Sequence, residues 1–219
     1  MTAASERPSQ GPPTATAVRS DAARNRRRMV AAVLELFAES GRIPPMEHVA
    51  AKAGVGKATL YRSYRTIDSL LAAAAHHQLL ELRGISQRRV DRGGDALQVL
   101  VDVVYGIVDY NRERGLYLEV VRRGNLAAEI REALAGTNAP LQAAMTACQE
   151  QGLLLRDDVT YADLQMMSSG CSLNLSLTRA SQQRWDRAGY LVLTAIGVPH
   201  DRADRSTRSP RRRSTADAT

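Results

Sequence analysis

The 219-residue sequence has few cysteines, almost no lysine and no long apolar run, and each shortage narrows the possible functions. The longest uncharged stretches, residues 133–149 and 164–178, are each shorter than about 18 residues and contain polar groups or proline, so neither is expected to span a bilayer. Residues 1–13 contain no apolar core of the kind that a secretory signal needs. The sequence therefore predicts a cytoplasmic protein with no membrane partner.

Cysteine occurs only at Cys148 and Cys171, which lie far apart in the sequence and have no CxxC spacing. This pattern favours a reducing compartment and two small buried side chains, with a redox pair as the alternative. The histidines have no carboxylate or cysteine partners at metal-ligand spacing. They are His48, His76, His77 and His200. No P-loop, Rossmann glycine pattern or nucleophile elbow is present, so we expect no metal, no cofactor and no catalytic residue. An all-helical enzyme remains an alternative.

Only Lys52 and Lys57 among the 30 basic residues are lysine. Because a guanidinium binds phosphate through two hydrogen bonds, this bias suits a nucleic-acid partner, although a GC-rich genome explains it equally well. Residues 1–65 contain 11 basic and 5 acidic residues (net +6), residues 66–200 contain 13 and 15 (net −2), and residues 201–219 contain 6 and 3 (net +3). A basic N-terminal segment on a near-neutral body is typical of a DNA-binding module joined to a separate domain.

The periodicity between the two ends is helical almost throughout, without strand-like alternation, and predicts an all-α fold. Asp21 is expected to cap the first helix and Gly41 to end it, while Thr66 caps a long helix that runs to a break at residues 92–94. Thr160 and Asp163 have the spacing of a capping box. The other predicted helices cover about residues 46–53, 57–63, 96–112, 116–122, 126–150, 161–178 and 184–196.

Residues 46–65, MEHVAAKAGVGKATLYRSYR, have the pattern of a helix-turn-helix. Ala50 is small where the two helices would touch, and Gly54 can adopt the left-handed turn conformation. Val49, Val55 and Leu60 supply the apolar contacts beneath. A plain helical hairpin would account for these features, but it would not account for the polar, basic face that the second helix exposes. That face consists of Lys57, Thr59, Tyr61 and Arg62.

The segments FAESG (37–41), Val49-Ala50 and AGVGKATLYR (53–62) resemble the N-terminal domain of TetR-family transcriptional regulators, over about residues 21–72. The body resembles more loosely the helical ligand-binding and dimerisation domain of that bacterial family. The resemblance implies a three-helix DNA-binding domain joined by a long linking helix to this body. The predicted divisions are a disordered arm (1–20), a DNA-binding domain (21–75), an effector-binding and dimerisation domain (76–200) and a disordered basic tail (201–219).

The resemblance places the helix 57–63 in the major groove of double-stranded DNA. Lys57 fits a base-edge or phosphate contact, and Ala58 fits contact with a thymine methyl. Thr59 and Tyr61 occupy positions that usually contact backbone phosphates, and Arg62 suits either role.

Further contacts are implied on either side of that helix. Arg24 and Arg28 would face the adjacent phosphates, and Tyr64 occupies a position where an aromatic ring usually packs near the DNA. Ile67 stands where the family often has lysine, so Arg65 is the candidate for the missing phosphate contact.

The resemblance also implies a C2 homodimer that binds a pseudo-palindromic operator through its two recognition helices. The predicted interface residues are Leu164, Leu173, Leu175, Leu177, Leu191 and Leu193. A small-molecule effector would bind in the body and release the DNA. The candidate pocket residues, each of which also fits simple core packing, are Tyr105, Tyr110, Tyr117, Met145, Met166 and Cys171. Repression, rather than activation, is expected only from the resemblance to the family. A non-specific nucleoid-associated DNA binder is the second alternative.

Overall fold

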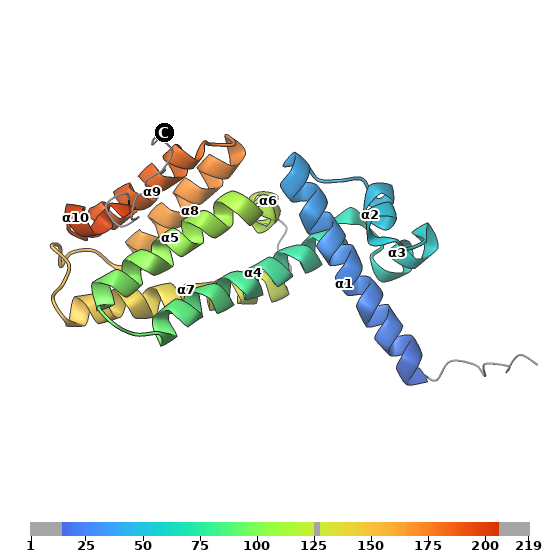
Figure 1. Ribbon diagram of the computed structural model, residues 1–219, viewed down its shortest axis with the longest axis horizontal. Helices are drawn as coiled ribbons and strands as arrows, with labels where there is room; N and C mark the ends of the chain where they lie inside the picture. Colours follow the sequence, from blue (N-terminus) through green and yellow to red (C-terminus); the bar gives the residue numbers. More distant parts are fainter. Residues whose placement is uncertain (1–14, 125–127, 206–219) are drawn as a thin grey trace, which may run out of the picture. The chain divides into compact units, whose positions relative to one another are not determined.

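The computed structural model describes residues 15–124 and 128–205, which form ten helices and no strand (Figure 1). The all-α prediction is therefore confirmed for this part of the chain. The helices are α1 (Ala15–Ser40), α2 (Met46–Ala53), α3 (Lys57–Ser63), α4 (Ile67–Asp91), α5 (Ala96–Arg114), α6 (Leu116–Arg122), α7 (Ala128–Glu150), α8 (Tyr161–Leu177), α9 (Gln182–Ala195) and α10 (His200–Ala203).

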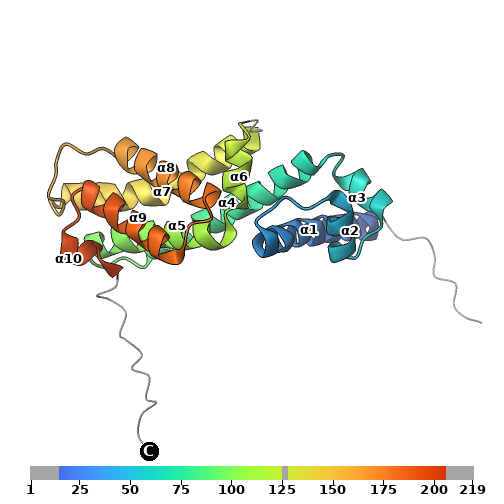
Figure 2. The same cartoon turned by 90° about the horizontal axis from the view of Figure 1, so that it is seen from above.

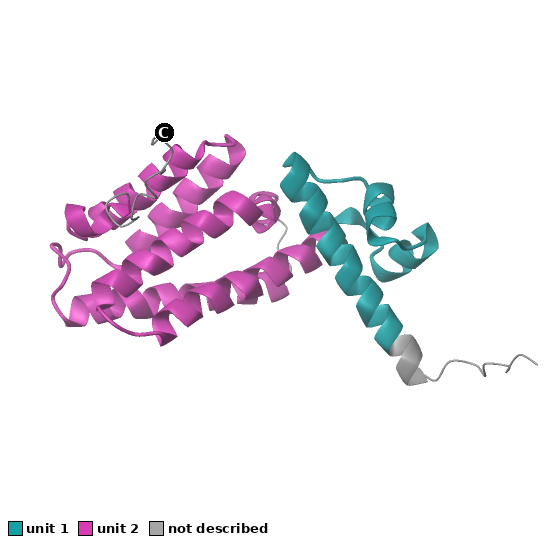
Figure 3. Cartoon of the chain, viewed as in Figure 1, with its two compact units in different colours: residues 1–70 teal, residues 71–219 magenta. Residues whose placement is uncertain are grey.

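The chain divides into two compact units, residues 1–70 and 71–219 (Figure 3). The division falls inside α4, just after its first turn. The sequence placed it between residues 75 and 76, a few residues further along the same helix. The predicted basic tail from residue 206 and most of the predicted arm lie outside the described residues.

Unit 1 is a three-helix arrangement in which α2 packs against both α1 and α3. Met29 and Val33 of α1, Val49 of α2 and Leu60 of α3 are fully buried. Ala50 is 3% exposed, in keeping with a small residue at a close helix contact. Val49 and Leu60 are two of the three apolar contacts that the sequence pattern assigned to a helix-turn-helix, and the third, Val55, is only half-buried.

The turn between α2 and α3 depends on Gly54. Its φ of +62° and ψ of +41° lie in the left-handed region, and its N–H caps α2 by donating to carbonyls of the last turn. An added Cβ would lie 2.6 Å from Arg28 Nη2, the movable end of an exposed side chain, so the main cost of a larger residue here is backbone strain. The prediction that this glycine makes the turn is confirmed.

Three predicted helix ends can be compared with the structure. Thr66 Oγ1 accepts from Ser69 N at 3.2 Å, and Thr160 and Asp163 form the expected reciprocal capping box. The prediction for Asp21 is wrong, because α1 begins at Ala15, inside the segment that was expected to be disordered. The helix continues past Asp21 through residues 15–20, which contain no glycine or proline to end it, and Asp21 instead pairs with Arg24 at 3.6 Å.

Unit 2 is built around α5, which packs against α7, α8 and α9, with α10 closing one end (Figures 1 and 2). Leu100 and Val103 of α5, Met145 and Cys148 of α7 and Leu193 of α9 are fully buried in one core cluster. Of the residues that the structure describes, none forms a helix both long and apolar enough to cross a membrane.

The buried thiol of Cys148 gives a testable pH dependence. Burial raises its pKa from the ordinary 9.0 to about 11. The unfolded chain therefore loses this proton near pH 9, whereas the folded chain retains it. The free energy of unfolding consequently has its full value below pH 9 and decreases between pH 9 and 11. We expect a loss of about 1 kcal/mol by pH 10. Urea unfolding of the wild type and of Cys148→Ala at pH 8, 9 and 10 checks this. The same decrease in the free energy of unfolding with pH in the variant would contradict it.

Candidate nucleic-acid interface and ligand cavity

The exposed face of α3 carries the side chains that the sequence assigned to DNA. Leu60 anchors the helix in the core of unit 1, while Lys57, Ala58 and Arg62 are exposed. Tyr61 is 43% exposed, unusually high for a large aromatic ring, and Thr59 is half-buried. One short helix is therefore fixed by its apolar side and offers the opposite side to a partner.

The two lysines differ in their partners. Lys52 of α2 lies 3.1 Å from Glu39 and 3.3 Å from Glu35 of α1, and its hydrogen bond to Glu39 is the main reason that its pKa is raised. This pair of contacts ties α2 to α1. Among the described residues Lys57 has no acidic partner. Its charge is therefore available to a ligand.

The arginines of α1 that were predicted to face phosphates are both exposed. Arg24 is the partner of Asp21, and the Arg28 guanidinium lies 3.5 Å from the carbonyl of Gly54 at the turn before α3. Arg28 is thus positioned beside the turn of the helix-turn-helix segment, which the sequence pattern did not indicate.

The residues that follow α3 differ in exposure. Tyr64 is half-buried, and burial raises the pKa of its hydroxyl while the charge of Arg26 opposes this shift. Arg65 is exposed, and Ile67 is half-buried at the first position of α4. Arg65 therefore provides an exposed cation near the place where the resemblance expects one.

Unit 2 contains a cavity of about 360 Å³ between α4, α5, α6, α7 and α8. Its apolar wall includes Leu82, Ile107, Leu118, Leu134 and Leu141. Its polar wall is formed by hydroxyl and amide groups, which belong to Asn111, Tyr117, Thr137, Asn138, Gln165, Ser168, Ser169 and Ser172. This volume and mixture of groups are typical of a small-molecule site.

Three polar side chains in this wall form a connected chain of hydrogen bonds. Tyr117 Oη donates to Asn111 Oδ1 at 2.6 Å, and Asn111 Nδ2 donates to Ser172 Oγ at 2.9 Å. All three residues are at least 90% buried. Burial raises the pKa of the Tyr117 hydroxyl well above its usual range, and the hydrogen bond to Asn111 opposes this only in part. The hydroxyl is therefore neutral at any ordinary pH.

Only one of the six predicted pocket residues, Tyr117, lines this cavity. Tyr105 donates to the carbonyl of Ala203, and Met145 is fully buried in the core. Met166 is 67% exposed, and Cys171 lines a much smaller cavity of about 10 Å³. The sequence missed Asn111 and Ser172, although Asn111 continues the apolar stripe of Leu100, Val104 and Ile107, where a polar residue is unexpected.

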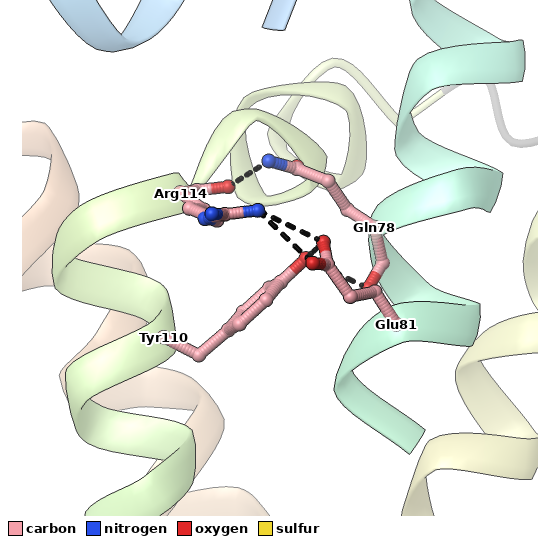
Figure 4. A network of polar contacts seen from close by, with 4 residues as sticks. All are labelled: Gln78, Glu81, Tyr110 and Arg114. Atoms are coloured by element: carbon pink, nitrogen blue, oxygen red, sulfur yellow. Dashed lines mark hydrogen bonds and ion pairs between the residues drawn. The ribbon is translucent and has the colours of Figure 1, made fainter. Parts of the chain in front are cut away.

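The sixth candidate, Tyr110, belongs to a polar network that joins α4 to α5 (Figure 4). Its hydroxyl, which has one proton to donate, lies 3.0 Å from the carbonyl oxygen of Gln78 and 2.9 Å from Glu81, and Arg114 forms an ion pair with Glu81 at 3.0 Å. The amide of Gln78 donates to the carbonyl of Arg114 and accepts from the N–H of Tyr117 at 2.9 Å. The Gln78 side chain of α4 therefore provides hydrogen-bond partners for a carbonyl at the end of α5 and for an N–H at the start of α6.

Neither a family model nor a curated protein matches this sequence. Solved structures do match. An ArpA-like gamma-butyrolactone receptor has a TM-score of 0.64 at 17% identity, covering 86% of this chain and 95% of its own. A regulatory protein of the TetR family from Rhodococcus RHA1 has a TM-score of 0.63 at 18% identity, covering 80% and 98%. RolR in complex with resorcinol has a TM-score of 0.60 at 16% identity, covering 84% and 93%.

The chain has the fold of the TetR-family regulators. This finding confirms the resemblance that the segment around α2 and α3 suggested, and it extends over most of the chain. None of these neighbours is described as an enzyme. Among the residues described, no group of three or more His, Cys, Asp or Glu side chains is placed to hold a metal ion.

In this TetR-type fold the leucines predicted to form a dimer interface separate into two groups. Leu164 and Leu193 are fully buried and Leu175 nearly so, so these three side chains are part of the core of unit 2. Leu177 of α8 and Leu191 of α9 are 56% and 48% exposed, and Leu173 is half-buried. Met166 of α8 adds a further exposed apolar side chain. The exposed apolar surface of α8 and α9 therefore keeps Leu177 and Leu191 from the predicted set and adds Met166.

Proposed function

We propose that this protein is a sequence-specific DNA-binding transcriptional regulator that inserts α3 into the major groove. The observation that carries the proposal is the exposed face of α3, where Lys57, Tyr61 and Arg62 project from a helix anchored by the buried Leu60. Lys57, a cation that has no acidic partner among the described residues, lies on this face with a hydroxyl-bearing aromatic, and the two suit phosphates and base edges. Arg24 and Arg28 would add phosphate contacts from α1.

We further propose that the protein acts as a C2 homodimer paired through the exposed apolar surface of α8 and α9. Met166, Leu177 and Leu191 are large apolar side chains exposed on these two helices. A two-fold pairing of α8 and α9 would bury them and would present two α3 helices to successive major grooves of a pseudo-palindromic operator.

The remaining part of the proposal is repression relieved by a small molecule in the 360 Å³ cavity. Two neighbours in fold support this part, since one is a gamma-butyrolactone receptor and another was solved with resorcinol. The cavity adjoins Tyr117, whose backbone N–H is held by Gln78 of α4. A ligand that displaced Tyr117 would therefore act on α4, the helix that contains the boundary between the two units.

The first test is capture of sheared genomic DNA by the full-length protein at moderate salt, followed by sequencing. A few enriched fragments sharing an inverted repeat are expected, with binding at least about 10³-fold tighter than to bulk DNA. Even recovery of all fragments, lost as the salt concentration rises, would instead identify a non-specific binder.

Single substitutions on α3 separate base contacts from phosphate contacts. Tyr61→Phe removes one hydroxyl and is expected to weaken all sites alike, by about threefold to tenfold. Lys57→Ala and Arg62→Ala are expected to cost about 1–3 kcal/mol at the best site and to relax discrimination if they contact bases. Electrophoretic mobility shift with matched operator variants measures both effects. His48→Ala, an exposed change on α2, is the control, and a shift of preferred sequence in Tyr61→Phe would contradict the phosphate assignment.

A further inference from the structure

We infer that the cavity of unit 2 selects an uncharged, mainly apolar small molecule with one hydrogen-bonding head group, which lies against Ser172 and Tyr117. The inference rests on the proposed function, in which this cavity is the effector site. It adds the chemical class of the ligand, argued from the residues that line this cavity.

The charge of the ligand is limited by the residues that surround it. Among the described residues that line the cavity, none carries a charged side chain. An ion transferred into such a site would lose its hydration without gaining a counter-charge, and this penalty is several kcal/mol even after relaxation. The cavity therefore rejects carboxylates and ammonium ions of the same size and shape.

The body of the ligand is limited by the apolar wall. Leucine side chains from α4, α6 and α7 face the cavity together with Ile107 of α5. Such a wall binds by removing apolar ligand surface from water, without directional contacts. An aromatic or aliphatic body satisfies it, whereas a nucleotide would bring charged phosphates into a cavity whose described lining offers no counter-charge.

The hydrogen-bond chain of Tyr117, Asn111 and Ser172 determines which head group the ligand can have. Asn111 uses its carbonyl oxygen for Tyr117 and its amide for Ser172, so its orientation is fixed. The Ser172 oxygen accepts from Asn111, and no described residue accepts its proton, so this hydroxyl can donate to a ligand. The Tyr117 oxygen donates to Asn111 and retains a lone pair that can accept. A donor and an acceptor that are both held by Asn111 suit a hydroxyl head group, which can accept and donate.

The test uses the full-length protein and three probes with the same rings: biphenyl-4-ol, biphenyl-4-carboxylate and (biphenyl-4-yl)methylammonium. Isothermal titration calorimetry at pH 7.5 measures their affinities. Biphenyl-4-ol is expected to bind at least about 100-fold more tightly than either ion. Thr137→Trp, which places an indole in the cavity, is expected to abolish this binding; Asn138→Trp serves the same purpose if the first variant does not fold by circular dichroism.

The head-group contact is tested by a matched pair of serines in the wall. Ser172→Ala is expected to weaken biphenyl-4-ol binding about fivefold to tenfold, since it removes a buried donor. Ser169→Ala makes the same change at an exposed lining position and is expected to alter the affinity less than twofold. Equal losses in the two variants would overturn the assignment of the head group to Ser172.

The remaining outcomes distinguish this inference from the proposed function. Binding of the carboxylate or the ammonium ion as tight as that of biphenyl-4-ol, and removed by Thr137→Trp, would overturn the ligand class. Absence of binding by all three probes in a protein that still binds its operator would overturn the inference and leave DNA binding intact. Selective binding of biphenyl-4-ol in the cavity without release of the operator would support the ligand class and contradict effector release.

Discussion

A variant with both Leu177→Glu and Leu191→Glu is expected to be a monomer whose affinity for an inverted-repeat operator is about 100- to 1,000-fold weaker than that of the wild type. Both leucines are about half-exposed, on α8 and α9, so the substitutions leave the core of unit 2 intact. In a two-fold interface they would introduce four carboxylates without partners, each costing several kcal/mol of desolvation. A monomer also loses the gain in affinity that two linked DNA-binding units provide.

Sedimentation equilibrium gives the mass of this double variant, and fluorescence anisotropy with full operator and half-site DNA gives its affinity. Leu155→Glu is the matched control, because Leu155 is 73% exposed but lies in the segment between α7 and α8 rather than on either helix. We expect it to remain dimeric and to bind as the wild type does. A dimeric double variant would contradict the interface, and a monomeric double variant with full operator affinity would contradict binding as a dimer.

The helix-turn-helix segment could be predicted from the sequence because its determinants are local. Gly54, Ala50 and Leu60 lie within a few residues of the turn that they shape, and the exposed face of α3 follows from the helical period once Leu60 is placed inside. The start of α1 was missed because Asp21 resembles a cap, whereas the segment before it, which lacks glycine and proline, continues the helix.

The cavity and the apolar surface could not be predicted in the same way, because both depend on contacts between distant helices. Asn111 and Ser172 are 61 residues apart and meet only when α5 packs on α8. Leu175 and Leu177 are equally apolar, but only Leu175 is buried. Which of the two is buried depends on which side of α8 packs against α5. Asn111, the polar residue in the apolar stripe of α5, was the available signal in the sequence, and it lines the cavity.

Gln78→Leu is expected to reduce the free energy of unfolding of unit 2 by about 2–4 kcal/mol, although it replaces a polar core residue by an apolar one of similar size. The Gln78 side chain is 97% buried and bonds to the carbonyl of Arg114 and the N–H of Tyr117. These two backbone groups lie at the end of α5 and the start of α6, where a helix cannot supply its own partners. Leucine would leave the buried N–H of Tyr117 and the partly buried carbonyl of Arg114 without this partner, at about 1–2 kcal/mol each.

Urea unfolding followed by circular dichroism measures this loss. Gln87→Leu is the matched control on the same helix, since the exposed Gln87 side chain bonds, among the described residues, to Asp91 one turn away at 2.8 Å. Its expected change is below about 0.5 kcal/mol.

Because the amide of Gln78 holds the backbone of cavity-lining Tyr117 to α4, biphenyl-4-ol should also release the operator less effectively from Gln78→Leu than from Gln87→Leu. Equal release by the two variants would show that the cavity acts on α4 through other contacts.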